Sequence, residues 1–223
     1  MSRIARAQDG YITSLIRARA HTRHANGERP AMTDRPTSAL LVMDMQNGIV
    51  ERFGDAVLEP AVRAIAAARG AGVTVVYVRV AFRAGHPEVS PRNRTFAALR
   101  DAGALGEDDA ATAVHPALAP RAGDVVVVKR RVSAFAGSDL DVVLRAGGID
   151  TLALCGIATS GVVLSSLRQA ADLDYRLTVL RDACADADEE VHRVLLDKVF
   201  PRQAEVVDVA AWAASLAPVR AAR

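Results

Sequence analysis

Residues 155–163 read Cys155-Gly156-Ile157-Ala158-Thr159-Ser160-Gly161-Val162-Val163. They stand where a short apolar run, residues 151–155, gives way to a longer segment with helical spacing, residues 160–173. A buried strand that leads directly into a helix is typical of α/β proteins. This join therefore predicts an α/β domain.

Strands and helices alternate on both sides of this join. The other apolar runs fall at residues 39–43, 73–78, 124–129, 176–180 and 204–207, and the other helical segments at 57–68, 138–146, 188–200 and 210–216. Repeated strand–helix alternation requires right-handed crossovers and a mostly parallel sheet covered by helices on both faces. We find no internal repeat, so the pattern predicts one α/β domain over residues 35–223.

The composition limits the classes of protein that fit. The chain has 223 residues, 51% of them apolar, and no apolar run long enough for a transmembrane helix. Its two cysteines argue against a disulfide framework and against a zinc cluster. We therefore expect a cytoplasmic protein, away from the membrane, with no metal and no other cofactor.

The positive charge is concentrated at the amino terminus. Residues 1–31 hold six arginines, and the rest of the chain has a formal net charge of −2. A domain without excess basic charge argues against nucleic acid as its partner. Met32 stands shortly before the first strand, so we interpret residues 1–34 as a disordered extension or as sequence upstream of a true start at Met32.

The segment 81–123 is rich in glycine and proline and has little regular structure, apart from a short helix predicted near residues 95–99. A segment of this length inside a compact domain usually forms a binding site or a lid. We expect a pocket lined by side chains from this segment and from the strand ends. The candidates are Gln46, Phe82, Arg83, His86 and Phe135.

Charged side chains stand at the carboxyl ends of the predicted strands, where α/β proteins bind ligands. Asp44 follows the first strand, Lys129 ends the third and Asp182 follows the fifth. Each has a structural alternative, because an aspartate after a strand often caps a helix or shapes a turn, and a lysine there is usually solvated. Together they predict a carboxylate and an ammonium group at one rim of the sheet.

Four ordered blocks of sequence carry a family resemblance. They are Leu41-Val42-Met43-Asp44-Met45-Gln46, Lys129-Arg130-Arg131-Val132-Ser133-Ala134-Phe135, Gly156-Ile157-Ala158-Thr159 and Arg181-Asp182-Ala183-Cys184-Ala185-Asp186. Over residues 38–210 the chain resembles the isochorismatase-like (cysteine hydrolase) superfamily, which includes nicotinamidases and N-carbamoyl amidohydrolases. The resemblance implies a three-layer α/β/α fold whose six-stranded, mostly parallel sheet has the order 3-2-1-4-5-6.

The resemblance also implies roles for the site residues. In the family an aspartate, a lysine and a cysteine form a triad, which makes Asp44 the general base and Lys129 its cationic partner. A cis peptide bond, here Ile157–Ala158, aims backbone N–H groups at an oxyanion. The oxyanion turn then consists of Ile157, Ala158 and Thr159.

The sequence departs from the family at the nucleophile. The family pattern Gly-x-Ala-Thr-x-x-Cys-Val places the cysteine at Val162, which has no nucleophilic atom. Acyl-enzyme chemistry at that position is therefore excluded. We interpret Cys155 as a buried apolar residue of the strand, and Ser160 as either a helix N-cap or an alternative nucleophile.

Three functions remain open from the sequence. The first is a hydrolase that uses Asp44, Lys129 and water on an amide-type C–N bond or an enol ether of a small molecule. The second is an amidohydrolase with Ser160 as its nucleophile. The third is a small-molecule binder or scaffold that kept the fold and lost the chemistry. The resemblance also implies a homo-oligomer, a dimer or tetramer. The apolar character of residues 157–167 makes this segment a candidate for the interface.

Overall fold

The computed structural model describes residues 37–216, so the predicted extension at residues 1–34 lies outside the described residues. Six strands in this part of the chain form one sheet with the order β3-β2-β1-β4-β5-β6, and every neighbouring pair is parallel. The order and the pairing confirm the predicted topology. The strands are β1 (Ser38–Met43), β2 (Thr74–Val80), β3 (Val125–Lys129), β4 (Thr151–Ile157), β5 (Arg176–Ala185) and β6 (Glu205–Val207).

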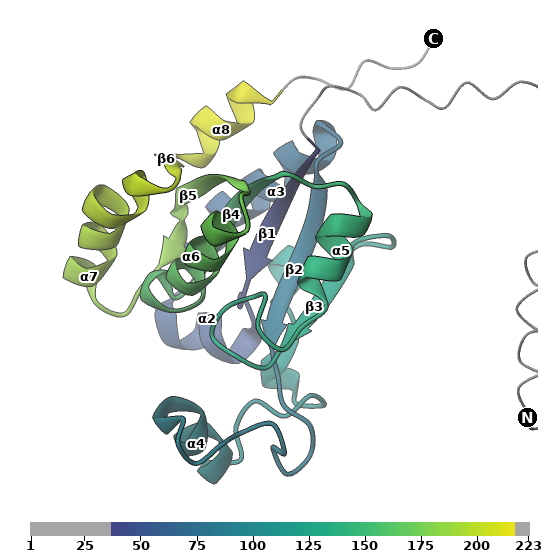
Figure 1. Cartoon of the computed structure of the whole chain (residues 1–223), viewed down its shortest axis with the longest axis vertical. Helices are drawn as coiled ribbons and strands as arrows, with labels where there is room; N and C mark the ends of the chain where they lie inside the picture. The colour runs from purple at the N-terminus through teal and green to yellow at the C-terminus, as the bar shows by residue number, and fades with distance from the viewer. Residues whose placement is uncertain (1–36, 217–223) are drawn as a thin grey trace, which may run out of the picture. The chain divides into compact units, whose positions relative to one another are not determined.

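Helices cover both faces of the sheet and complete the three layers (Figure 1). The α-helices are α2 (Asn47–Phe53), α3 (Leu58–Gly70), α4 (Arg94–Asp101), α5 (Leu140–Ala146), α6 (Leu164–Asp172), α7 (Glu189–Val194) and α8 (Val209–Ser215). Helices α3 and α8 contact each other on one face, and α5 and α6 lie over the opposite face. Single turns of 3₁₀-helix lie at η1 (Ala110–Thr112), η2 (Pro116–Leu118) and η5 (Phe200–Arg202), and π-helical turns at η3 (Thr159–Val163) and η4 (Leu195–Val199).

The core explains why these segments take these forms. Five of the six residues of β1 are buried, since helices cover the strand on both sides, and this is the reason for its continuous apolar run. In α3 the buried residues Leu58, Ala61, Ile65 and Ala68 recur at helical spacing, so only one face of the helix is apolar. Each fully buried large aliphatic side chain contributes about 1.5–3 kcal/mol to the stability of the fold.

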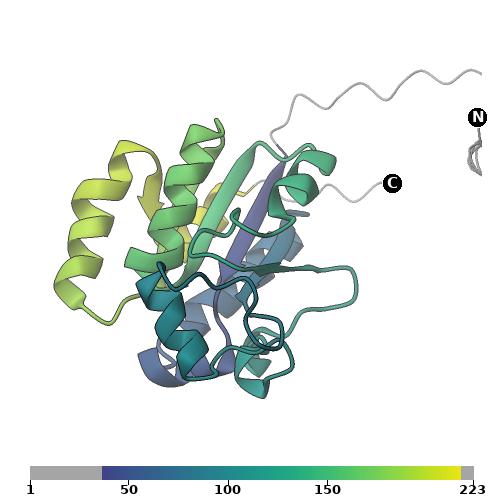
Figure 2. The same cartoon turned by 60° about the horizontal axis from the view of Figure 1, so that its bottom comes forward.

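The segment 81–123 contains more structure than the sequence predicted. Helix α4 is longer than the predicted helix at 95–99, and η1 and η2 follow it. The segment forms a second small hydrophobic core from Val80, Phe82, Val89 and Phe96. Figures 1 and 2 show α4 and its flanking loops beyond the carboxyl ends of the strands. The segment therefore has a core of its own.

The order of the strands reverses between β1 and β4. The two strands are neighbours over their full length, and the last pair in their register is Met43 with Gly156. In open α/β sheets, ligands bind outside the carboxyl ends of the strands at such a reversal. The residues that follow Met43 and Gly156 therefore mark the expected site. Within residues 37–216 we find no helix with the length and hydropathy needed to cross a bilayer.

Candidate active site

Asp44 and Lys129 form a buried ion pair at this reversal. Nζ of Lys129 lies 2.8 Å from Oδ2 of Asp44, and the two side chains are only 3% and 8% exposed respectively. The same ammonium group donates hydrogen bonds of 3.0 Å to the carbonyl oxygens of Arg131 and Val132. All three N–H donors of Lys129 therefore have a partner.

The second carboxylate oxygen of Asp44 differs from the first. Oδ1 is buried and has no hydrogen-bond partner among the described residues. Burial raises the pKa of Asp44 to about 6, although the charge and the hydrogen bond of Lys129 and the nearby backbone N–H of Val80 act in the opposite direction. A carboxyl group with a pKa close to neutral exchanges a proton readily at physiological pH. Asp44 therefore combines a free acceptor oxygen with a pKa suited to proton transfer.

Gly156 allows the end of β4 to approach Asp44 closely. Its φ of 153° lies in a region that residues with a side chain rarely adopt. A Cβ atom built there would lie 2.3 Å from the carbonyl oxygen of Met43, the residue before Asp44. Only glycine fits this contact, so the glycine in the turn brings β4 directly against the carboxyl end of β1.

The turn after Gly156 has the backbone that the resemblance implies. The Ile157–Ala158 peptide bond is cis. The π-helical turn η3 follows, in which the N–H of Val163 donates to the carbonyl oxygen of Ala158 at 3.3 Å. The N–H of Ser160 donates to Oδ2 of Asp186 at 2.6 Å, which ties the turn to the segment after β5.

Val162, at the usual nucleophile position, is a core residue. It is 2% exposed and belongs to the main hydrophobic core. The two cysteines are buried as well, and Sγ of Cys155 lies 3.5 Å from the carbonyl oxygen of Leu41. Burial raises the pKa of the Cys155 thiol far above its usual range and that of Cys184 to about 12. Both thiols are therefore protonated at neutral pH.

Ser160 does not cap a helix, contrary to one of its two predicted roles. Ala158 precedes η3 and Val163 precedes α6, so Ser160 lies inside the π-helical turn. Ser160 is exposed, and within residues 37–216 its hydroxyl forms no hydrogen bond with Asp44 or Lys129. Neither Asp44 nor Lys129 is therefore hydrogen-bonded to the Ser160 hydroxyl as the general base that a serine nucleophile needs.

Gln46 is a structural residue, although we expected it to line a pocket. It is fully buried, and its amide exchanges two hydrogen bonds with the backbone of Val80, at 2.8 and 2.9 Å. The same amide donates to the carbonyl oxygen of Thr112 at 2.9 Å. These bonds fasten the segment 81–123 to the sheet, so the side chain is fully used by backbone partners.

The predicted aromatic lining is also packed into the protein. Phe82 is fully buried, with its ring centroid 5.4 Å from that of Phe96 and 5.3 Å from that of His86. Nε2 of His86 lies 2.7 Å from the carbonyl oxygen of Ala104. Phe82 and Phe96 belong to the second core, against which the His86 ring packs, because a segment this long must bury apolar surface to remain ordered.

Phe135 and Arg83 complete the predicted lining, with different outcomes. Phe135 is 7% exposed and packs against Tyr175, with 6.1 Å between the ring centroids. Arg83 is exposed and lines a cavity of about 770 Å³ together with Arg130 and Arg131. Of the five predicted lining residues, Arg83 is therefore the one that this cavity includes.

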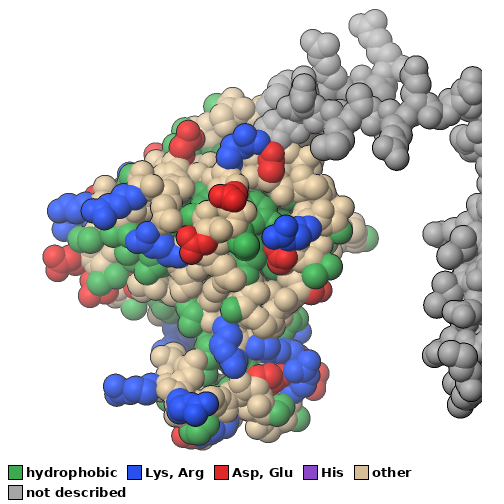
Figure 3. All heavy atoms as spheres, in the orientation of Figure 1, with side chains coloured by type: hydrophobic (Ala, Val, Ile, Leu, Met, Phe, Trp, Pro, Cys, Tyr) green, Lys and Arg blue, Asp and Glu red, His purple; other side chains and the backbone are tan. Residues whose placement is uncertain are grey.

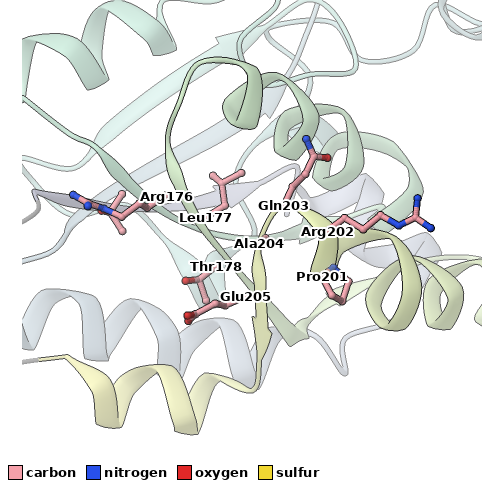
Figure 4. A pocket seen from close by; sticks show the side chains of 9 residues that line it. Arg176, Leu177, Thr178, Pro201, Arg202, Gln203, Ala204 and Glu205 are labelled. Atoms are coloured by element: carbon pink, nitrogen blue, oxygen red, sulfur yellow. The ribbon is translucent and has the colours of Figure 1, made fainter.

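Three cavities of the described residues do not include Asp44 or Lys129 in their lining. One of about 570 Å³ is lined by Thr151 and Arg176, the first residues of β4 and β5, and so lies at the opposite end of the sheet (Figure 4). Another, of about 400 Å³, lies against α2. None of these cavities, the 770 Å³ cavity included, is lined by Asp44 or Lys129.

Asp182 and the segment 157–167 also have structural roles. Asp182 was expected to follow the fifth strand, but it lies within β5, which extends to Ala185. Its Oδ1 accepts a hydrogen bond of 2.8 Å from the N–H of Val209, so the side chain caps the start of α8. Ile157, Val163 and Leu167 are buried in the core of the chain itself, so these side chains are not available to an interface. Figure 3 shows acidic and basic side chains interspersed on the face that it displays.

No cluster of three or more His, Cys, Asp or Glu side chains suited to a metal ion occurs within residues 37–216. His192, in α7, contacts the turn, which the sequence did not predict. Its Nδ1 lies 2.8 Å from the hydroxyl oxygen of Thr159. Residues 33 positions apart make this contact, and the histidine has no distinctive neighbours in the sequence, so no local pattern pointed to it.

Comparisons with known proteins identify the family of the chain. The chain is 36% identical over 179 residues to the isochorismatase family protein YecD of Escherichia coli O157:H7, covering 78% of this chain and 93% of YecD. It is 34% identical over 212 residues to the ureidoacrylate amidohydrolase RutB of Methylobacterium radiotolerans, covering 84% and 82% of the two chains.

Solved structures show the same fold. A cysteine hydrolase from Pseudomonas syringae superimposes with a TM-score of 0.74 at 28% identity, covering 80% of this chain and 91% of that one. The N-carbamoylsarcosine amidase from Thermoplasma acidophilum gives 0.66 at 29% identity, covering 78% and 96%. The family model of the isochorismatase domain matches residues 38–211. The chain belongs to the isochorismatase family.

Proposed function

We propose that the chain is a small-molecule hydrolase in which Asp44 transfers protons, Lys129 holds the Asp44 carboxyl group in place, and no thiol nucleophile takes part. The substrate bond is an amide-type C–N bond or an enol ether. The observation that carries the proposal is the buried pair with one free oxygen, Oδ1 of Asp44, and a pKa of about 6. General acid–base catalysis requires both features.

The names of two relatives support the C–N bond. The relative at 34% identity is a ureidoacrylate amidohydrolase, and one structural neighbour is an N-carbamoylsarcosine amidase. Both names describe hydrolysis at a ureido or carbamoyl group. We therefore place N-carbamoyl and ureido acids first among the substrates to test. We also propose that the chain acts on them in the cytoplasm.

For a C–N bond the reaction balances without a covalent intermediate. The Asp44 carboxylate takes a proton from a water molecule, and the water oxygen forms a bond to the carbonyl carbon. We assign the oxyanion-binding role to the N–H groups of the turn 157–159, as the family resemblance implies. The C–N bond then breaks, the nitrogen takes the proton back from Asp44, and the carboxylate is restored.

For an enol ether the same group acts first as an acid. Protonated Asp44 gives its proton to the terminal alkene carbon, and water adds to the resulting oxocarbenium carbon. Asp44 takes a proton from that water, and the hemiketal divides into an alcohol and a carbonyl compound. A pKa of about 6 leaves both protonation states populated near neutral pH, so either order is chemically accessible.

A scaffold without activity is the second candidate function. Val162 occupies the nucleophile position as a buried side chain, and the cavities described above do not reach the ion pair. On this alternative Asp44 and Lys129 survive as a structural pair. An enzyme must instead open a path to Oδ1, either within the chain or by forming the homo-oligomer that the family resemblance implies.

The test is a substrate panel with matched variants. The purified full chain is incubated with N-carbamoyl amino acids, ureido acids, simple amides and enol ethers, and products are followed by mass spectrometry. We expect turnover that Asp44→Asn abolishes. Asp174→Asn is the control, because Asp174 is exposed and has the same left-handed backbone conformation as Asp44. Its φ is 65°, and that of Asp44 is 55°.

Two results of the panel would change the proposal. If the native chain turns over none of these classes, the scaffold function is favoured. If Ser160→Ala abolishes turnover as completely as Asp44→Asn, the hydroxyl is the nucleophile and the direct attack of water is wrong. Light scattering of the same sample measures whether the chain is a dimer or tetramer.

A further inference from the structure

The hydroxyl of Thr159 is shared between two partners from other elements. Thr159 is fully buried and begins η3, directly after the cis peptide bond. Its Oγ1 lies 3.1 Å from the carbonyl oxygen of Ala185, at the end of β5, and 2.8 Å from Nδ1 of His192, in α7. One buried side chain thus joins the turn to the end of β5 and to α7, the helix that follows it.

Counting hydrogens decides which partner donates. A threonine hydroxyl has one hydrogen to donate, and a carbonyl oxygen can only accept. The hydroxyl must therefore donate to Ala185 if that contact is a hydrogen bond. The remaining contact with His192 is then satisfied only when Nδ1 carries a hydrogen and donates to Oγ1. The other neutral tautomer leaves the Ala185 carbonyl without this donor, because the hydroxyl would point at Nδ1 instead.

We propose that His192 is a positioning residue whose Nδ1–H donates to Thr159 and thereby holds the turn of residues 157–163 in place beside Asp44. As a role in catalysis, this inference rests on the proposed function, because it concerns the turn that would face the substrate. The tautomer itself does not depend on any activity. Nε2 of His192 is left as an acceptor without a partner among the described residues.

The hydrogen bond between His192 and Thr159 does not depend on the protonation state of Nε2 near neutral pH. Burial is the largest effect on the pKa of His192 and lowers it. Among the smaller effects, Asp186 and Asp197 raise this pKa and Arg181 lowers it. The imidazole is therefore neutral at neutral pH. Nδ1 keeps its hydrogen when Nε2 is protonated, so the bond to Thr159 is present in both charge states. The contact is a fixed support and not a pH switch.

A second contact acts on the next residue of the turn. The N–H of Ser160 donates to Asp186, one residue after the Ala185 carbonyl that accepts from Thr159. The side chain and the backbone of two consecutive turn residues are therefore held by residues 185–192. Two such contacts fix the orientation of the turn, and oxyanion stabilisation requires backbone N–H groups of fixed direction.

The first test is the tautomer of His192 in the native chain. Long-range ¹H–¹⁵N correlation spectra of ¹⁵N-labelled protein at pH 7.5, assigned by loss of the signal in His192→Asn, distinguish the two ring nitrogens. We expect Nδ1 to be protonated and Nε2 to be free. An imidazole protonated at Nε2 with a bare Nδ1 would overturn the inference, whatever activity the chain has.

The second test uses a variant that restores the donor. Asparagine places an N–H group at the same δ position as Nδ1 of histidine, whereas alanine removes it. We expect His192→Ala to lower kcat about tenfold or more with little change in KM, and His192→Asn to recover most of kcat. Arg193→Ala, at an exposed position in the same helix, is the control.

Thermal unfolding separates this inference from the proposed function. His192→Ala and Thr159→Val should each lower Tm, and the double variant should lower it by less than the sum, because both remove the same bond. Strictly additive shifts would overturn the inference. If the native chain shows no turnover, the proposed function fails while the tautomer and the Tm cycle still decide whether the contact exists.

Discussion

Nζ of Lys129 lies 2.8 Å from Oδ2 of Asp44, and the two groups are satisfied unequally. Every N–H of the ammonium group has an acceptor, whereas Oδ1 of the carboxylate is buried with no partner among the described residues. Buried polar atoms in folded proteins are nearly always paired, so an unpaired one calls for an explanation. A carboxylate whose Oδ2 is paired with an ammonium group and whose Oδ1 has no partner is suited to receive a proton at Oδ1.

The ion pair predicts a strong coupling in stability. Asp44→Asn or Lys129→Met alone leaves a buried group without its partner, so each should lower the free energy of unfolding by about 3 kcal/mol or more. The double variant removes both charges and should cost clearly less than the sum. Urea denaturation of the four proteins measures the cycle, and additive losses would show that the two residues are independent.

The pH dependence of the reaction separates the two substrate bonds. With a pKa of about 6, Asp44 is a carboxylate above that pH and a carboxylic acid below it. If it acts first as a base on water, as for a C–N bond, kcat/KM rises with pH through about 6. If it acts first as an acid on an enol ether, kcat/KM falls over the same range. A profile without a transition near pH 6 would mean that Asp44 does not control the rate.

The close contact at Gly156 predicts a severe substitution. Gly156→Ala would place Cβ 2.3 Å from a backbone oxygen in a φ region that alanine avoids, so we expect a loss of at least about 3 kcal/mol in unfolding free energy. Gly161→Ala in the same turn is the control. Its nearest neighbour is 3.7 Å away, and the change should stay within about 1 kcal/mol. Equal effects at both positions would contradict the contact.

The thiols should be inert in the native chain. Cys155 and Cys184 are buried, and the pKa of each is raised by that burial, so iodoacetamide at pH 8 should label neither residue without denaturant. Turnover after treatment should be unchanged, as mass spectrometry and the substrate assay together would show. Loss of activity on labelling one native cysteine would instead indicate thiol chemistry.

The strands and the order of the sheet followed well from the sequence, but one helix did not. Short apolar runs between turns mark buried strands, and the family resemblance supplied their order. Helix α2 was missed because Asn47 and Gly48 are typical turn residues. Its start is fixed by distant partners, since Nδ2 of Asn47 donates to the carbonyl oxygen of Ala110 at 2.8 Å. A contact across 63 positions has no local pattern.

The site was predicted in part for a similar reason. Asp44 follows β1 and Lys129 ends β3, two parallel strands on either side of β2, so position along the chain placed both residues at one rim of the sheet. Phe82 and His86 were expected to line a pocket, but Phe82 belongs to the second core and His86 packs against it, because their segment folds against itself. Burial in such a segment depends on side chains that meet only after folding, which composition and spacing do not reveal.

The most direct test of the account is the turnover of Asp44→Asn relative to the native chain and to Asp174→Asn, on the first substrate that the panel identifies. Because Asp44 is the group that moves the proton, we predict that kcat/KM falls by about 100-fold or more in Asp44→Asn and is unchanged in Asp174→Asn. Full turnover by a folded Asp44→Asn protein would contradict the account.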